Sequence, residues 1–133
     1  MALVQSPPAL LDLVRGEAVG QVVTALEVYG INSLKSVVPP LSEVSGRTVE
    51  AADFDLQGRL VFTLAGDLIL RVNFERTGGL VVVATTEFWK PGAPGTQPTA
   101  RMLFQTGRGL DFREPGRTKR IAFDLRLSES GTG

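Results

Sequence analysis

The stretch from Asp55 to Phe88 constrains the fold more than any other part of the chain. It reads DLQGRLVFTLAGDLILRVNFERTGGLVVVATTEF, in which three runs rich in apolar residues are separated by short segments that contain Gly. Apolar and polar residues alternate along these runs, as they do in strands that bury one face. Short Gly-containing breaks between such runs favour tight turns between antiparallel neighbours. The stretch therefore predicts an antiparallel meander.

The remaining sequence adds further strands and an N-terminal helical region. The expected strands are Arg47–Phe54, Arg59–Leu64, Leu68–Arg76, Leu80–Trp89, Thr99–Gln105, Gly109–Arg113 and Lys119–Leu127. Val19, Val22, Val23 and Leu26 have helical spacing, and Gly16 marks where the helix would bend or divide. The expected fold class is α+β: an N-terminal helix, broken or unbroken, followed by a curled, mostly antiparallel β-meander of six to seven strands, barrel-like or half-barrel.

A single domain over residues 1–133 is expected from the length. Its parts are a tail at 1–8, a helical region at 9–30, a connector at 31–46, a β-meander at 47–127 with an exposed loop at 90–98, and a flexible tail at 128–133. Pro39-Pro40 excludes a regular helix in the connector, and the loop KPGAPGTQP is too rich in Pro and Gly for a strand.

The alternation also assigns the strand residues to two faces of the sheet. The expected inner face consists of Leu60, Phe62, Leu64, Leu68, Leu70, Val72, Phe74, Met102, Phe104, Leu110, Phe112, Ile121, Phe123, Leu125 and Leu127. This face is larger than one helix can cover, so the sheet is expected to curl on itself. The outer face is mostly polar, but it carries a smaller apolar stripe: Val61, Ile69, Val81, Val83 and Leu103. Either the N-terminal helix covers this stripe, or the stripe is a protein interface.

Catalysis is not expected, because the chain has no Cys and no His. Their absence excludes Ser-His-Asp and Cys-His systems and zinc sites built on these residues. Asp53-Phe54-Asp55-Leu56-Gln57-Gly58 opens like a calcium loop, but the twelfth position is Leu64, where the metal needs a bidentate acid. We therefore expect no catalytic residue, no metal and no cofactor.

The best functional candidate is a basic segment in the second half of the chain. The net charge is zero, but six cations fall within twenty residues: Arg101, Arg108, Arg113, Arg117, Lys119 and Arg120. Such a segment is a solvated surface, a contact with a protein partner, or a site for single-stranded nucleic acid. Phe104 and Phe112 are interleaved with the cations, but alternation places both rings on the core face. Trp89, before the Pro/Gly-rich loop, is either a lid on the core or an interface anchor.

These observations favour a non-catalytic protein-interaction or assembly module, with a protein partner or self-association preferred over nucleic acid. One alternative is single-stranded nucleic-acid binding through residues 101–120; another is binding of an apolar small ligand inside the curled sheet. No apolar run is long enough to span a membrane, and no basic leader precedes an apolar block at the N-terminus. A cytoplasmic protein without a membrane partner is therefore expected.

Overall fold

The computed structural model describes residues 3–29, 40–74, 78–84, 98–114 and 121–127. In these parts of the chain the helices are α1 (Pro7–Glu17) and the short 3-10 helix η1 (Leu41–Val44). The strands are β1 (Val23–Val28), β2 (Val49–Phe54), β3 (Leu60–Leu64), β4 (Leu68–Asn73), β5 (Gly79–Ala84), β6 (Ala100–Phe104), β7 (Arg108–Arg113) and β8 (Ala122–Leu127).

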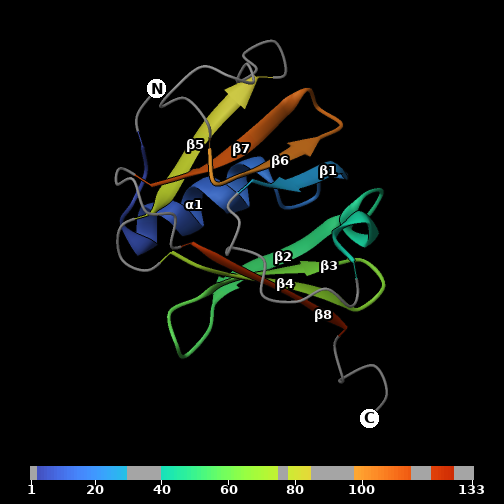
Figure 1. The fold of residues 1–133 in the computed structure, drawn as a ribbon, viewed down its shortest axis with the longest axis horizontal. Coiled ribbons are helices and arrows are strands. Elements are labelled where there is room, and N and C mark those ends of the chain that lie inside the picture. The colour runs from blue at the N-terminus through green and yellow to red at the C-terminus, as the bar shows by residue number, and fades with distance from the viewer. Residues whose placement is uncertain (1–2, 30–39, 75–77, 85–97, 115–120, 128–133) are drawn as a thin grey trace.

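The strands form two antiparallel sheets that face each other (Figure 1). Sheet I has the strand order β1-β6-β7-β5, and sheet II has the order β2-β3-β4-β8. The α+β class and the antiparallel pairing are confirmed, but the expected barrel-like closure is wrong. Among the described residues the end strands of each sheet do not pair with one another. The apolar inner face is instead covered by the second sheet, which is the other way for a sheet of this size to bury one side.

The first part of the predicted meander is correct, and its continuation is not. β2, β3 and β4 follow one another as antiparallel neighbours, joined by the predicted turns at Asp55–Gly58 and Ala65–Asp67. After β4 the chain changes sheet: β4 pairs with β8, and β5 pairs with β7. The break at Thr77-Gly78-Gly79 was expected to be a hairpin, but it lies between a strand of sheet II and a strand of sheet I.

The helical region expected at 9–30 is wrong beyond Glu17, because β1 occupies Val23–Val28. β1 pairs with β6, and its register shifts between Val23 and Ala25. This irregularity places Val23 and Leu26 in the core three residues apart, which is helix-like spacing on a strand. Gly20, at φ 88°, separates helix from strand, because only Gly adopts this conformation readily.

Helix α1 closes one open side of the sandwich (Figure 1). Before α1, Val4 exchanges two backbone hydrogen bonds of 2.9 Å with Leu80 of β5, so the expected tail at 1–8 is anchored from Val4 onward. After α1, the Gly20 N–H donates to the Val49 carbonyl of β2 at 2.8 Å. The helix therefore runs from the β5 edge of sheet I to the β2 edge of sheet II and buries Leu10 and Val14. The sequence suggested that this helix covers the outer apolar stripe, but α1 does not do so.

Alanine substitutions at Gly16 and at Gly20 should change the free energy of unfolding in opposite directions. An added Cβ meets no heavy atom within 4 Å at Gly16 or Gly20, so backbone conformation decides both outcomes. Gly16→Ala, inside α1, should raise the free energy of unfolding by about 0.5 kcal/mol. Gly20→Ala should lower it by about 1–2 kcal/mol, since its φ is left-handed. Urea denaturation checks the pair, and equal shifts of the same sign would contradict the assignment of helix end and strand start.

The core between the sheets contains nearly all of the predicted inner face. Leu127 is 60% exposed, and the other fourteen predicted residues are buried. Phe112 of sheet I stacks on Phe74 at 6.1 Å between ring centroids and meets Phe123 of sheet II edge-on at 5.1 Å. These rings lie between the two sheets. Within the described part of the chain, no helix has the length and apolar character needed to cross a membrane.

Candidate nucleic-acid interface

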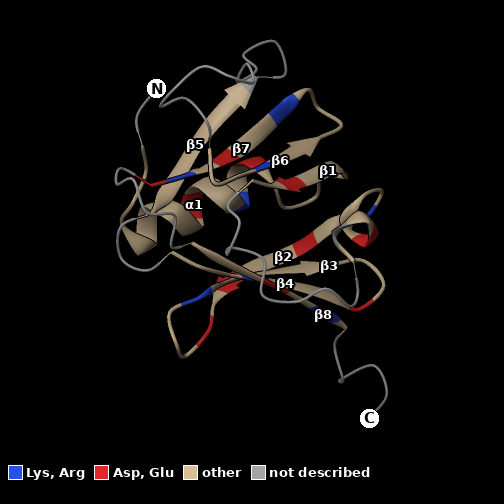
Figure 2. Cartoon of the chain, viewed as in Figure 1, with Lys and Arg blue, Asp and Glu red and all other residues tan. Residues whose placement is uncertain are grey.

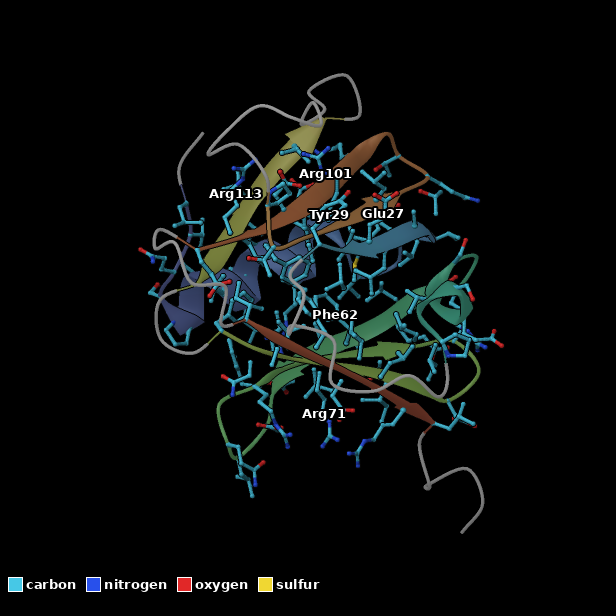
Figure 3. All side chains as sticks on the ribbon, viewed as in Figure 1. Glu27, Tyr29, Phe62, Arg71, Arg101 and Arg113 are labelled. Carbon is cyan, nitrogen blue, oxygen red and sulfur yellow. The ribbon has the colours of Figure 1, made fainter. Side chains whose placement is uncertain are left out.

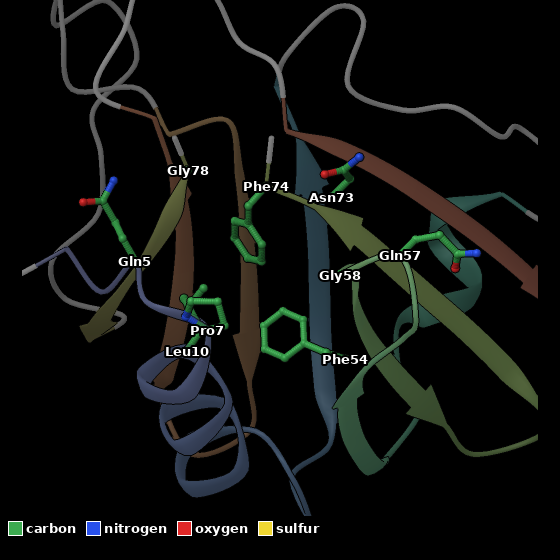
Figure 4. A pocket seen from close by; sticks show the side chains of 9 residues that line it. All are labelled: Gln5, Pro7, Leu10, Phe54, Gln57, Gly58, Asn73, Phe74 and Gly78. Atoms are coloured by element: carbon green, nitrogen blue, oxygen red, sulfur yellow. The ribbon is translucent and has the colours of Figure 1, made fainter. Parts of the chain in front are cut away.

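A pocket of about 460 Å³ opens at the end of the sandwich where α1 begins (Figure 4). Its walls come from the start of α1, the end of β2, the β2–β3 turn, the end of β4 and the start of β5. The lining residues are Gln5, Pro7, Leu10, Phe54, Gln57, Gly58, Asn73, Phe74 and Gly78. We call this region the pocket end. Its volume lies within the range of small-molecule sites.

The lining of this pocket combines amide groups with apolar surface. Gln5, Gln57 and Asn73 carry carboxamides, and Phe54 and Phe74 contribute rings. None of the nine lining residues has an ionisable side chain. The pocket can therefore supply hydrogen bonds and apolar contact, but its lining offers no group for proton transfer. Sequence reasoning missed this site, because its residues come from separate segments and are ordinary turn and strand-end types.

The β2–β3 turn beside the pocket is held by the Asp55 carboxylate. Asp55 Oδ1 accepts hydrogen bonds of 2.9 Å from the backbone N–H groups of Gln57 and Arg59, and Oδ2 pairs with Arg59 Nε at 2.8 Å. Burial alone would raise the pKa of Asp55, but the hydrogen bonds from Arg59 and Gln57 outweigh it and lower this pKa. The Asp55 carboxylate therefore stabilises the turn. Within the described ranges no group of three His, Cys, Asp or Glu side chains could hold a metal ion.

The described arginines of the basic segment lie in different environments. Arg101 is 4% exposed and binds the fully buried Asp111 through two hydrogen bonds, Nε to Oδ1 at 2.6 Å and an Nη to Oδ2 at 2.8 Å. Arg113 binds the same carboxylate at 3.0 Å and is one-third exposed. Arg108 is exposed and pairs with Glu17 at 2.8 Å. Arg101 is thus unavailable to a partner, and Arg108 lies at the opposite end of β7 from Arg113. Arg117, Lys119, Arg120 and Trp89 lie outside the described residues.

Glu114 connects the residues that flank the basic segment on its two sides. The buried Glu114 carboxylate accepts hydrogen bonds from Thr99 Oγ1 at 2.7 Å and from the Ile121 N–H at 3.0 Å. Ile121 in turn lies against Gly78 of the pocket lining, since a Cβ built at Gly78 would be 2.6 Å from Ile121 Cδ1. Gly79, the next residue, pairs with Arg113. The residues that flank 115–120 on both sides are therefore at the pocket end.

Tyr29 lies beside the buried ion pair, as Figure 3 shows. Its hydroxyl donates a hydrogen bond to the Glu27 carboxylate, and Glu27 is the cross-strand partner of Arg101. Burial and then the hydrogen bond to Glu27 raise the pKa of Tyr29 to about 12. Tyr29 is therefore protonated at neutral pH and does not act as a base there.

The predicted apolar stripe is divided between the two sheets. Val61 and Ile69 are half-buried on the outer side of sheet II. Val81, Val83 and Leu103 belong to sheet I, where Val81 and Val83 are buried. The five residues are therefore not one contiguous surface, because the strands that were expected to be neighbours separate after β4.

Each arginine that the structure describes is paired with a carboxylate. Figure 2 shows where the charged residues lie along the ribbon. Two carboxylates are shared: Asp111 by Arg101 and Arg113, and Asp124 by Arg71 and Arg126. At the Asp111 cluster, the Glu27 carboxylate across the strand from Arg101 adds a second negative charge. The two clusters lie on opposite outer faces of the sandwich, as the labelled Arg113 and Arg71 show in Figure 3.

Comparison with known proteins identifies the fold but no sequence family. No family model and no curated protein matches the sequence. Solved structures do match. Lactococcus lactis Fpg in complex with DNA that contains an abasic site has a TM-score of 0.74 at 15% identity, over 98% of this chain and 46% of that one. Fpg (MutM) from the same organism, with FAPY-dG-containing DNA, has a TM-score of 0.71 at 16% identity, over 92% and 43% of the chains.

The chain thus has the fold of part of these proteins and spans less than half of their length. A mutant LlFpg in complex with THF-containing DNA gives the same result, with a TM-score of 0.74, 15% identity and coverage of 98% and 45%. This likeness corrects the main interpretation drawn from the sequence. A protein-interaction or assembly module is contradicted, because the structural neighbours are complexes with DNA. The nucleic-acid alternative agrees better with these neighbours.

Proposed function

We propose that this chain is a DNA-binding domain that binds at its pocket end. The observation that carries the proposal is the match of 98% of the chain, at a TM-score of 0.74, to a protein in complex with DNA. The neighbours are under 20% identical and twice as long, so their activities are not transferred to this chain. The cytoplasmic location expected from the sequence remains part of the proposal.

Charge supports the pocket end over the other described surfaces. The described residues include eight arginines and eleven acids, and the chain as a whole is neutral, so the remaining segments carry the compensating positive charge. Arg117, Lys119 and Arg120 belong to these segments, and their flanking residues Glu114 and Ile121 are fixed beside the pocket. Phosphate contacts supply most of the affinity in non-specific DNA binding. In this proposal these three residues and Arg113 provide those contacts.

The proposal is for binding without catalysis. The pocket lining has carboxamides and rings but no ionisable group, and Tyr29 is protonated at neutral pH. An amide can read hydrogen-bonding edges or hold a backbone, but it does not exchange protons near neutral pH. Arg101 and Asp111 are hydrogen-bonded to each other on the outer side of sheet I.

A binding titration tests the proposal. Fluorescence anisotropy with a fluorescein-labelled duplex at 50 mM salt should give a Kd in the micromolar range or tighter, as expected for non-specific binding. A single strand of the same length in parallel decides whether the duplex or the single strand is the preferred form. Anisotropy that stays flat for both, at protein concentrations of about 100 µM, would remove the proposal.

A further inference from the structure

Leu56 is the most exposed large apolar side chain among the described residues. Its relative exposure is 103%, and the next such residue, Leu127, is 60% exposed. Leu56 is in the β2–β3 turn, between Asp55 and the pocket residue Gln57. A single exposed Leu is common on protein surfaces and needs no explanation by itself. Two features of the surrounding turn distinguish this one.

The first feature is that the turn is rigid. The Asp55 carboxylate accepts hydrogen bonds from two backbone N–H groups and from the Arg59 side chain, as described above. The backbone adds a hydrogen bond from the Asp55 N–H to the Arg59 carbonyl at 2.9 Å and one from the Gly58 N–H to the Asp55 carbonyl at 3.0 Å. Gly58 has a φ of 78°, which completes the reversal. A side chain on such a turn is positioned before binding, so little conformational entropy is lost when it inserts into a partner.

The second feature is the position of the turn at the rim of the pocket. Gln57 and Gly58 both line the pocket, next to Phe54 (Figure 4). The turn also brings little net charge toward a polyanion, because Asp55 is paired with Arg59 at 2.8 Å. An apolar residue therefore protrudes next to a cavity, on a turn whose carboxylate is neutralised.

We propose that Leu56 is an apolar wedge that inserts between neighbouring bases when the domain binds duplex DNA. This inference rests on the proposed function and deepens it, since it specifies how the pocket end meets the duplex. Proteins that deform DNA insert Leu, Phe, Ile, Met or Pro between base steps, and the apolar contact offsets the lost stacking. Such a kink opens the groove at that step on the side of the pocket rim, where the Gln57 carboxamide keeps its NH2 group to donate, because its Oε1 accepts a hydrogen bond from Arg59 at 3.2 Å.

The experiment uses a duplex with one 2-aminopurine beside a TA step, which is among the easiest steps to unstack. Binding of the wild-type chain should increase 2-aminopurine fluorescence, because stacking quenches it. Leu56→Ser should abolish the increase and weaken binding roughly ten-fold, which corresponds to about 1.4 kcal/mol. Leu56→Met should retain the increase, since Met is also a wedge residue. Leu127→Ser is the matched control at the second exposed Leu of the described residues and should behave as wild type.

The outcomes separate this inference from the proposed function. If the wild-type chain binds the duplex without a fluorescence increase, or if Leu56→Ser and Leu127→Ser behave alike, the wedge is wrong and DNA binding stands. If the wild-type chain does not bind, both fail. Because Leu56 is fully exposed, Leu56→Ser should leave the urea midpoint unchanged, and that measurement shows that a loss of binding is not a loss of fold.

Discussion

Replacing Asp111 with Ala should lower the free energy of unfolding by about 3–5 kcal/mol. Asp111 is fully buried and accepts two hydrogen bonds from Arg101, which is itself 4% exposed. The substitution leaves the Arg101 guanidinium buried without the carboxylate to which it donates two hydrogen bonds, and Arg113 also loses its partner. Since single domains have a total of about 5–15 kcal/mol, this loss is a large part of the stability of a domain. Urea denaturation followed by far-ultraviolet circular dichroism measures the change.

Two further variants identify the cause of this loss. Glu17→Ala removes the partner of the exposed Arg108 and should leave the urea midpoint unchanged, because solvent screens that pair. The double variant Arg101→Met, Asp111→Leu removes both charges together and should recover most of the stability lost in Asp111→Ala. If Asp111→Ala is no worse than Glu17→Ala, the buried ion pair does not stabilise the outer side of sheet I.

The second large effect is expected in DNA affinity. The triple variant Arg117→Glu, Lys119→Glu, Arg120→Glu should weaken duplex binding at 50 mM salt by roughly 100-fold. This estimate assigns on the order of 1 kcal/mol to each lost phosphate contact. The slope of log K against log salt should also become shallower by about three units, since each phosphate contact releases counterions. Anisotropy titrations over a salt series measure both quantities.

A control triple reverses the same amount of charge elsewhere. Arg15, Arg108 and Arg126 have side chains that are 52%, 53% and 56% exposed, respectively, and none lines the pocket. Their replacement by Glu changes the net charge as much as the first triple does, so any general electrostatic effect appears in both. Equal losses of duplex affinity in the two triple variants would mean that the basic segment has no special role and that the DNA contacts lie elsewhere.

Local sequence patterns predicted the strands in which apolar and polar residues alternate regularly. Phe62 and Phe123 were assigned to the inner face correctly, because each lies in a strand without irregularity. β1 was missed because its register shift gives Val23 and Leu26 a spacing that is typical of a helix. The division into two sheets was missed because it depends on the pairing of β4 with β8 and of β5 with β7. Such long-range pairings leave no local signal in a single sequence.

The candidate site was less predictable than the fold. Alternation placed Arg101 on the outer face, but it did not predict that Asp111 pairs with it or that the pair is buried. Nothing in the sequence indicated that Glu114 accepts hydrogen bonds from Thr99 and Ile121, which lie on either side of the basic segment. Polar residues at turns and strand ends, such as Gln57 and Asn73, were the available signal for the pocket. That signal is weak, because such residues are common in turns for reasons of backbone conformation.

The most direct test of the central claim is the duplex titration of the wild-type chain at 50, 100 and 200 mM salt. Binding at the pocket end predicts a Kd in the micromolar range or tighter at the lowest salt, and a linear fall of log K with log salt. Its slope should be about −3 to −4, from Arg113, Arg117, Lys119 and Arg120. No binding at 50 mM salt, or an affinity that salt does not change, would contradict a DNA-binding domain.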